Sequence, residues 1–328
     1  MKVRFSLYNR PDEIRELLDS LLEQQYENFE VVVVEDGSQN TAKELVESYG
    51  ETLTVRYFYK ENSGQGFTRN YGFARANGDY FIIFDSDCII PPHYLQTVKD
   101  QLEQEWLDAY GGPDASHEAF TPMQRAIGYS MTSLFTTGGI RGQKKHLGPY
   151  HPRSFNMGMS RQVYETVGGY PITWMGEDII YAIMIVEAGF KTGLIEDAYV
   201  YHKRRTDFRQ FFKQLKFFGR ARINVYTYHP RELKLVHFFP AAFLAFCAFT
   251  LLVIPLDLQL FLLLFGIHII YSMAIFIDAL LRNTSSVVAV LSMVAAYTQL
   301  IAYGYGFIGE YWKRVIKGQR SEVTKYPS

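Results

Sequence analysis

Two long apolar runs near the carboxyl end constrain the fold of this chain more than any other feature. Residues Phe238 to Leu256 and Leu258 to Ile277 carry almost only apolar side chains. A helix of about 20 such residues can cross the hydrocarbon core of a bilayer. Little more than Pro255-Leu256-Asp257 separates the runs. The sequence therefore predicts a tight pair of membrane helices.

A third apolar run, Val287 to Ile308, allows two interpretations. It is apolar enough to span, but it also carries Gln299, two glycines and several tyrosines. Three full crossings would place the basic residues between 313 and 320 on the outer side, against the tendency of Lys and Arg to stay inside. Either the third segment is partial or interfacial, or the chain breaks this tendency.

A basic segment precedes the membrane region. Residues 203–234 hold ten Lys or Arg against two acidic residues, and Phe, Leu and Ile side chains interleave at near-helical spacing. An aromatic face beside a basic face is typical of a helix on an anionic membrane surface. The mixture could also bind RNA, but the segment leads directly into an apolar run. We therefore expect membrane lipids as partners and no nucleic acid.

The first half of the chain alternates strands and helices. Runs 3–7, 29–34, 54–59 and 80–84 are predicted strands, and Pro11 suits the first position of a helix. Successive strand–helix units predict an α/β domain with an open, mainly parallel sheet. Ligands bind at the carboxyl ends of the strands in such sheets.

An acidic cluster, Asp85-Ser86-Asp87, directly follows the apolar strand 80–84. Two carboxylates at this place can share Mg²⁺ or Mn²⁺ with the phosphates of a nucleotide. The alternative is a solvated turn, since Asp and Ser are common turn residues. The surrounding motifs favour the metal.

Five motifs occur in a characteristic order. They are Asn9-Arg10-Pro11, Glu35-Asp36-Gly37-Ser38, Asn62-Ser63-Gly64 with Arg69-Asn70, Asp85-Ser86-Asp87, and Gly176-Glu177-Asp178. Together they resemble the family-two glycosyltransferases of GT-A (Rossmann-like) fold, over residues 3 to 203.

The resemblance implies a role for each motif. The donor-binding residues would be Leu7, Tyr8, Asn9, Asp36, Arg69, Asp85, Ser86 and Asp87. Asp87 and His202 would be the metal ligands, although His202 could also be a capping or interfacial histidine. Asp178 would be the catalytic base of an inverting transfer, with Glu177 beside it shaping the acceptor site. The cofactor would be Mn²⁺ or Mg²⁺, and the donor a nucleotide-sugar, with UDP the family expectation.

A single transfer is expected, because the Gln-x-x-Arg-Trp motif of processive synthases is absent from the sequence. Residues 105–160 are expected to form a loop over the site, where Lys144 and Lys145 either bind a phosphate of the acceptor or are merely exposed. Arg220 and Arg222 are predicted to bind acceptor or donor phosphates.

These expectations divide the chain into a catalytic domain (1–205), a basic interfacial segment (206–236) and a membrane region of two to three helices (237–328). The catalytic domain should be cytoplasmic, because the start of the chain has no long apolar run and the two cysteines suit a reducing compartment. The predicted acceptor is a lipid-linked saccharide. The alternatives are a polyprenyl-phosphate sugar synthase and a catalytically silent, membrane-bound nucleotide-sugar sensor.

Overall fold

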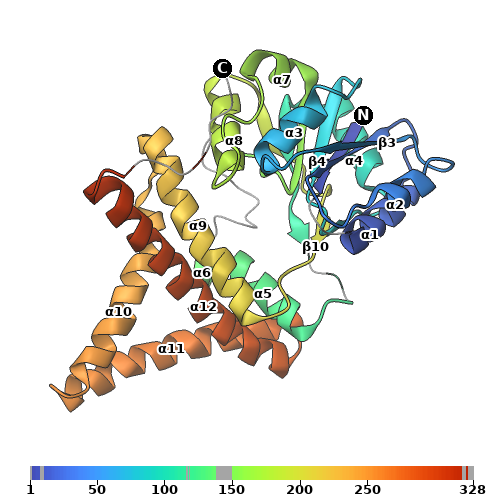
Figure 1. The fold of residues 1–328 in the computed structure, drawn as a ribbon. Helices are drawn as coiled ribbons and strands as arrows, with labels where there is room; N and C mark the ends of the chain where they lie inside the picture. The colour runs from blue at the N-terminus through green and yellow to red at the C-terminus, as the bar shows by residue number, and fades with distance from the viewer. Residues whose placement is uncertain are drawn as a thin grey trace. The chain divides into compact units, whose positions relative to one another are not determined.

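A computed structural model describes residues 11–115, 117, 119–137, 150–319 and 323, and the backbone of residues 2–7. The described residues form two compact units (Figure 1). Residues 2–115 and 150–203 make up the first unit, together with residue 323. The second contains residues 117–137 and 204–319.

A seven-stranded mixed sheet forms the centre of the first unit. Its strands, in spatial order, are β3 (Val55–Lys60), β2 (Glu30–Asp36), β1 (Lys2–Leu7), β4 (Tyr80–Phe84), β8 (Asn156–Ser160), β6 (Ala109–Gly111) and β9 (Thr192–Leu194). The first four are parallel, as predicted. β8 is antiparallel to both of its neighbours. The α/β fold with a mainly parallel sheet is therefore confirmed.

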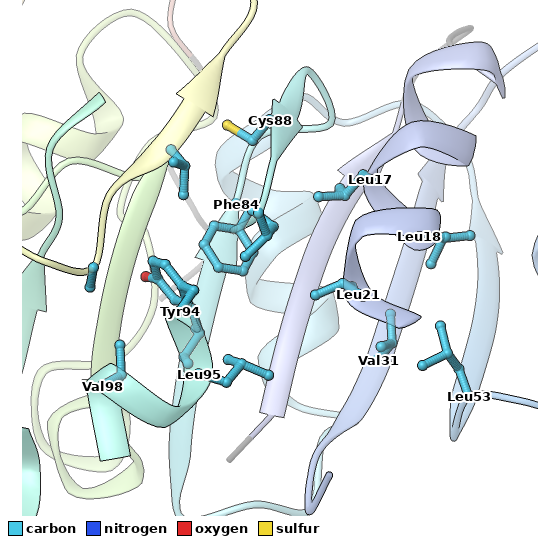
Figure 2. Packing of buried hydrophobic residues seen from close by; sticks show 14 of the residues in the cluster. Leu17, Leu18, Leu21, Val31, Leu53, Phe84, Cys88, Tyr94, Leu95 and Val98 are labelled. Atoms are coloured by element: carbon cyan, nitrogen blue, oxygen red, sulfur yellow. The ribbon is translucent and has the colours of Figure 1, made fainter. Parts of the chain in front are cut away.

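Helices cover both faces of this sheet. They are α1 (Pro11–Leu22), α2 (Lys43–Ser48), α3 (Gln65–Phe73), α4 (Tyr94–Gln104), α7 (Arg161–Val167) and α8 (Glu177–Glu187). The run Val31–Val34 contributes alternate side chains to two separate cores, because neighbouring residues of a strand point to opposite faces. Figure 2 shows one of these cores, in which leucines of α1 and residues of α4 pack with Val31 and Phe84.

A second, three-stranded sheet matters most for the site. Its spatial order is β5 (Cys88–Ile89), β10 (Val200–His202) and β7 (Asp114–Ala115). Strand β5 begins just after the acidic cluster 85–87, and β10 comes from the far end of the first unit's sequence. Their antiparallel pairing joins these two segments.

The second unit is helical. It contains α5 (Pro122–Thr132), α6 (Leu134–Thr137), α9 (Phe208–Tyr228), η1 (Pro230–Glu232), η2 (Leu235–Phe238), α10 (Phe239–Val253), α11 (Leu258–Asn283), α12 (Ser286–Tyr311) and η3 (Trp312–Ile316). Among the described residues, three segments are long and apolar enough to cross a membrane: Leu235–Val253, Leu258–Asn283 and Ser286–Ile316.

The prediction of a loop across residues 105–160 is wrong where the structure describes that region. Strands β6, β7 and β8 and helices α5 and α6 lie within it. Thr121 caps α5: its side chain accepts a hydrogen bond from Gln124 N, and the Gln124 side chain accepts one from Thr121 N. This capping box stabilises the start of the helix. The predicted three-part division of the chain remains a prediction.

Candidate active site

The turn after β4 carries the acidic cluster 85–87. Cys88 follows it and begins β5, and the β5–β10 register places His202 directly opposite Cys88. The hydrogen bond from Lys203 N to the carbonyl oxygen of Asp87, 2.9 Å, continues this pairing. As a result, His202 Nε2 lies 3.0 Å from Asp87 Oδ1, and both side chains are mostly buried.

These side chains form a group suited to a metal ion. One ligand atom each from Asp87, Cys88 and His202 lies within 4.8 Å of the other two. Two ligand atoms about 2.1 Å from one metal, at right angles to each other, are roughly 3 Å apart, which matches the distance between Asp87 and His202. The carboxylate oxygen of Asp87 suits Mn²⁺, and the imidazole of His202 and the sulfur of Cys88 would add donors that other transition metals also accept. The residues therefore fit a divalent ion.

A buried arginine joins two carboxylates of the site. Arg69, on α3, lies with Nη2 3.0 Å from Asp85 Oδ1 and Nη1 3.0 Å from Glu177 Oε1. Its guanidinium lies over the ring of Tyr170, and Gln65 donates a second hydrogen bond to Glu177. The predicted contact between Arg69 and a nucleobase remains a prediction, while the guanidinium already holds Asp85 and Glu177 in place.

Burial makes Glu177 an unusual carboxyl group. Its removal from water and the neighbouring Asp178 carboxylate raise the pKa of Glu177 to about 7, against the opposing effect of Arg69. The group is therefore partly protonated near neutral pH.

Asp178 occupies a more accessible position in the first turn of α8. Gly176 caps this helix in the left-handed conformation, and Met175 before it also has a positive φ of 66°. Such backbone is costly for a residue with a side chain and is common at functional sites. The helix N-terminus favours a carboxylate, and Arg153 Nη1 lies 3.3 Å from Asp178 Oδ2.

Asp36 organises a loop beside the site. Its carboxylate accepts hydrogen bonds from the backbone N–H groups of Ser63 and Gly64, each 2.9 Å, and from Lys60 Nζ at 2.6 Å. The loop therefore leads into α3 with a fixed geometry. A nucleoside contact by Asp36 remains a prediction, and it would have to be made by a carboxylate that already holds this loop.

The other predicted donor residues are only partly described. Ser86 Oγ donates a hydrogen bond to Glu13 Oε2 of α1, at 3.2 Å. Leu7 ends β1 opposite Glu35, and the structure gives its backbone only. Tyr8 and Asn9 lie outside the described residues.

The predicted phosphate-binding cations have different surroundings. Lys144 and Lys145 lie outside the described residues. On α9 of the second unit, Arg220 Nε lies 2.8 Å from the buried carboxylate of Glu310. The Nε atom of Arg222 is buried and has no hydrogen-bond partner among the described residues. Arg220 is thus already paired, and a phosphate contact by either arginine remains a prediction.

Sequence reasoning missed three members of this site: Arg153, Gln65 and Cys88. Cys88 directly follows the acidic cluster, so its position in the sequence was an available signal. Arg153 has no local pattern that marks it, because it meets Asp178 only in the folded chain.

Comparison with known proteins identifies the family of the chain. Residues 5–168 match glycosyl transferase family 2. The chain belongs to this family. It is 38% identical over 111 residues to an uncharacterized glycosyltransferase of Rickettsia felis, and 33% identical over 103 residues to glycosyltransferase GlyA of Streptococcus pneumoniae serotype 4. These alignments cover 32% and 31% of this chain, but only 18% and 15% of the relatives.

A solved structure extends the likeness to most of this family-two chain. It is the mannosyltransferase PcManGT from Pyrobaculum calidifontis in complex with GDP-Man and Mn²⁺. The TM-score is 0.56 at 18% sequence identity, and the alignment covers 95% of this chain and 87% of the other. At this identity the likeness concerns the fold, which is the GT-A fold of glycosyltransferases.

Proposed function

We propose that this chain is a membrane-anchored, metal-dependent, inverting glycosyltransferase that moves one sugar from a nucleotide-sugar to a lipid-linked saccharide. The observation that carries the proposal is the pairing of β5 with β10, which sets His202 beside Asp87 at the carboxyl end of β4. The Glu177 carboxylate of α8 is linked to the same turn through Arg69, which joins it to Asp85. Family membership supplies the reaction class.

The donor diphosphate would lie at the carboxyl end of β4. Asp87 and His202 would hold the metal, with Cys88 next to them. When bound, this ion stabilises negative charge on phosphoryl oxygens as a Lewis acid. Mn²⁺ and GDP-Man in PcManGT support an ion and a nucleotide-sugar in this fold, and UDP remains the expected nucleotide of this chain's donor.

Asp178 would act as the base. Its carboxylate would take the proton of an acceptor hydroxyl while that oxygen attacks the anomeric carbon, and the bond from this carbon to the diphosphate would break. The 3.3 Å contact with Arg153 orients one oxygen and leaves the other for the hydroxyl. Glu177 is less suited, because its carboxylate is buried and engaged by Arg69.

The direct connection between the two units in the sequence supports a lipid-linked acceptor. β10 ends at His202, and α9, which carries the basic aromatic pattern, begins at Phe208. Because only a short linker separates them, the proposed metal ligand His202 lies close in sequence to a helix suited to an anionic lipid surface. Each Lys or Arg on such a helix contributes about 1 kcal/mol to membrane binding. An acceptor held in the same membrane would then meet the site without diffusing from solution.

A comparison of two acceptors tests this proposal. One glycan is presented once on a polyprenyl diphosphate in vesicles and once on a short soluble aglycone, with the same donor and Mn²⁺. We expect transfer to the lipid-linked form to be at least tenfold more efficient. Equal efficiency would contradict the lipid-linked acceptor, and donor consumption without a metal requirement would contradict the metal site.

A further inference from the structure

The three apolar helices of the second unit differ in how much of their surface the protein covers. In an 18-residue stretch of each helix, 17% of the residues are buried in Leu235–Val253 and 11% in Leu258–Asn283, against 50% in Ser286–Ile316. The three helices are therefore similar in composition but differ in how much protein surrounds them. The first two helices expose most of their apolar side chains, and the third is half covered.

Helix α9 covers much of α12. A methyl group at Gly306 would lie 2.0 Å from the carbonyl oxygen of Lys216, and one at Gly219 would lie 2.1 Å from that of Tyr303. The backbones are therefore in close contact. Further along, Arg220 pairs with Glu310 at 2.8 Å, and Arg314 pairs with the same buried carboxylate.

Helix α9 is too highly charged to lie inside the hydrocarbon core of the bilayer. α9 carries five cations: Arg209, Lys213, Lys216, Arg220 and Arg222. Each charge at the bilayer centre costs at least about 2.5 kcal/mol, so the set would cost more than about 10 kcal/mol. Because α12 packs along α9, α12 must share the polar depth of α9.

The ends of the α10–α11 hairpin independently indicate that α12 lies outside the hydrocarbon core. These helices meet at the short turn between Val253 and Leu258, so a hairpin that crosses the bilayer has its two open ends on one side. α12 touches the open end of α10, and along α11 it touches residues from His268 to the open end. A methyl group at Gly304 would lie 2.4 Å from the carbonyl oxygen of Pro240, and Ala279 packs with Ala289. Figure 1 shows α12 joining these ends.

The exposed side chains of α12 fit an interfacial position. Its exposed large apolar and aromatic residues are Val287, Val290, Val294, Tyr305 and Ile308, and Trp312 follows. Most of them are three or four residues apart, which places them on one stripe of the helix. The opposite side of α12 is covered by protein, so this stripe is the surface that remains to face acyl chains, as in a helix that lies in the plane of the interface. Tyr and Trp favour the same depth.

We propose that the chain crosses the bilayer twice, through α10 and α11, and that α12 lies in the interface on the side of α9. The partner of the α12 stripe is the acyl-chain boundary of that leaflet. Lys313, Arg314 and Lys317 then remain on the same side as the cations of α9, as the distribution of Lys and Arg in membrane proteins favours. This inference concerns topology and does not require the proposed reaction.

Labelling of single cysteines tests the topology. The background is the full chain with Cys88→Ala and Cys247→Ala, expressed in bacterial cells. Lys213→Cys marks α9, Leu256→Cys marks the hairpin turn, and Lys317→Cys marks the segment after α12. A membrane-impermeant maleimide is applied separately to right-side-out and everted vesicles, and all three positions are exposed in the folded chain.

We expect residues 213 and 317 to label in one vesicle type and residue 256 in the other, with at least a fivefold preference in each case. Labelling of 317 together with 256, opposite 213, would show that α12 crosses and would overturn the proposal. Labelling of all three from one side would overturn the double crossing. If Lys317→Cys fails to insert, Lys313→Cys provides the same readout. No donor or acceptor is needed, so a failure of the proposed function leaves this result unaffected.

Discussion

At the scale of single residues, the pair formed by Asp87 and His202 makes the metal proposal testable. A ligand at 100 times its dissociation constant stabilises a folded protein by about 2.7 kcal/mol. We therefore expect Mn²⁺ with a nucleoside diphosphate to raise the thermal midpoint of the wild-type chain, and Asp87→Ala to abolish this rise. Asp100→Ala, which removes an exposed acid of α4, is the matched control. An undiminished rise in Asp87→Ala would exclude Asp87 as a ligand.

Glu177 gives a second residue-scale prediction, which concerns pH. Its pKa is about 7 in the folded chain against an ordinary value of 4.5. Between about pH 5 and pH 8 the folded state therefore binds more protons than the unfolded state, so its stability falls as pH rises. A shift of this size corresponds to at most about 3 kcal/mol.

The variant Glu177→Gln cannot ionise and removes this pH-dependent loss. We expect its thermal midpoint, relative to that of the wild type, to be higher at pH 8 than at pH 5. In Arg69→Lys the stability should still fall as pH rises, as in the wild type, because a cation remains beside the carboxyl group. If the difference in thermal midpoint between Glu177→Gln and the wild type does not change with pH, the assigned pKa is contradicted.

At the scale of elements, the contact of α9 with α12 depends on glycine. In Gly306→Ala the new methyl group would meet the carbonyl oxygen of Lys216, so the helices must separate. Overpacking of this kind typically costs about 1–3 kcal/mol. Gly309, on the same helix, has nothing within 4 Å of an added methyl group. Gly309→Ala should be neutral or stabilising, because Ala favours helix over Gly by about 1 kcal/mol.

Thermal unfolding in detergent measures this contrast. We expect a lower midpoint for Gly306→Ala and an unchanged or higher midpoint for Gly309→Ala. Equal midpoints for the two variants would mean that α9 and α12 do not pack as described.

The elements also show which parts of the fold could be predicted from sequence. The first four strands and their helices were predictable, because each is signalled by a local apolar pattern and the connections are short. The strand that ends at His202 was also predictable from its apolar and aromatic residues. β5 and α5 were not, because a two-residue strand depends on a distant partner and α5 lies in a region without simple alternation. The same contrast holds within the site. Asp85, Asp87 and Asp178 lie in local motifs, whereas Arg153 and the pairing of Arg69 with Glu177 arise only on folding.

At the scale of the whole molecule, a GT-A unit and a helical membrane unit are joined directly where β10 leads into α9. The proposed metal ligand His202 lies just before this junction. The proposed membrane-held acceptor rests on this direct connection, and a mere sensor of nucleotide-sugars would not need the base that is proposed at Asp178.

The most direct test of the central claim is therefore transfer itself, measured with labelled nucleotide-sugars, Mn²⁺ and a lipid-linked acceptor, for the wild type and Asp178→Asn. We expect one transferred sugar for the wild type and a rate lower by a factor of about 10²–10⁴ for Asp178→Asn at unchanged donor affinity, because a general base is lost. Asp197→Asn, at an exposed position, should behave as the wild type. Transfer by Asp178→Asn at the wild-type rate would exclude Asp178 as the base.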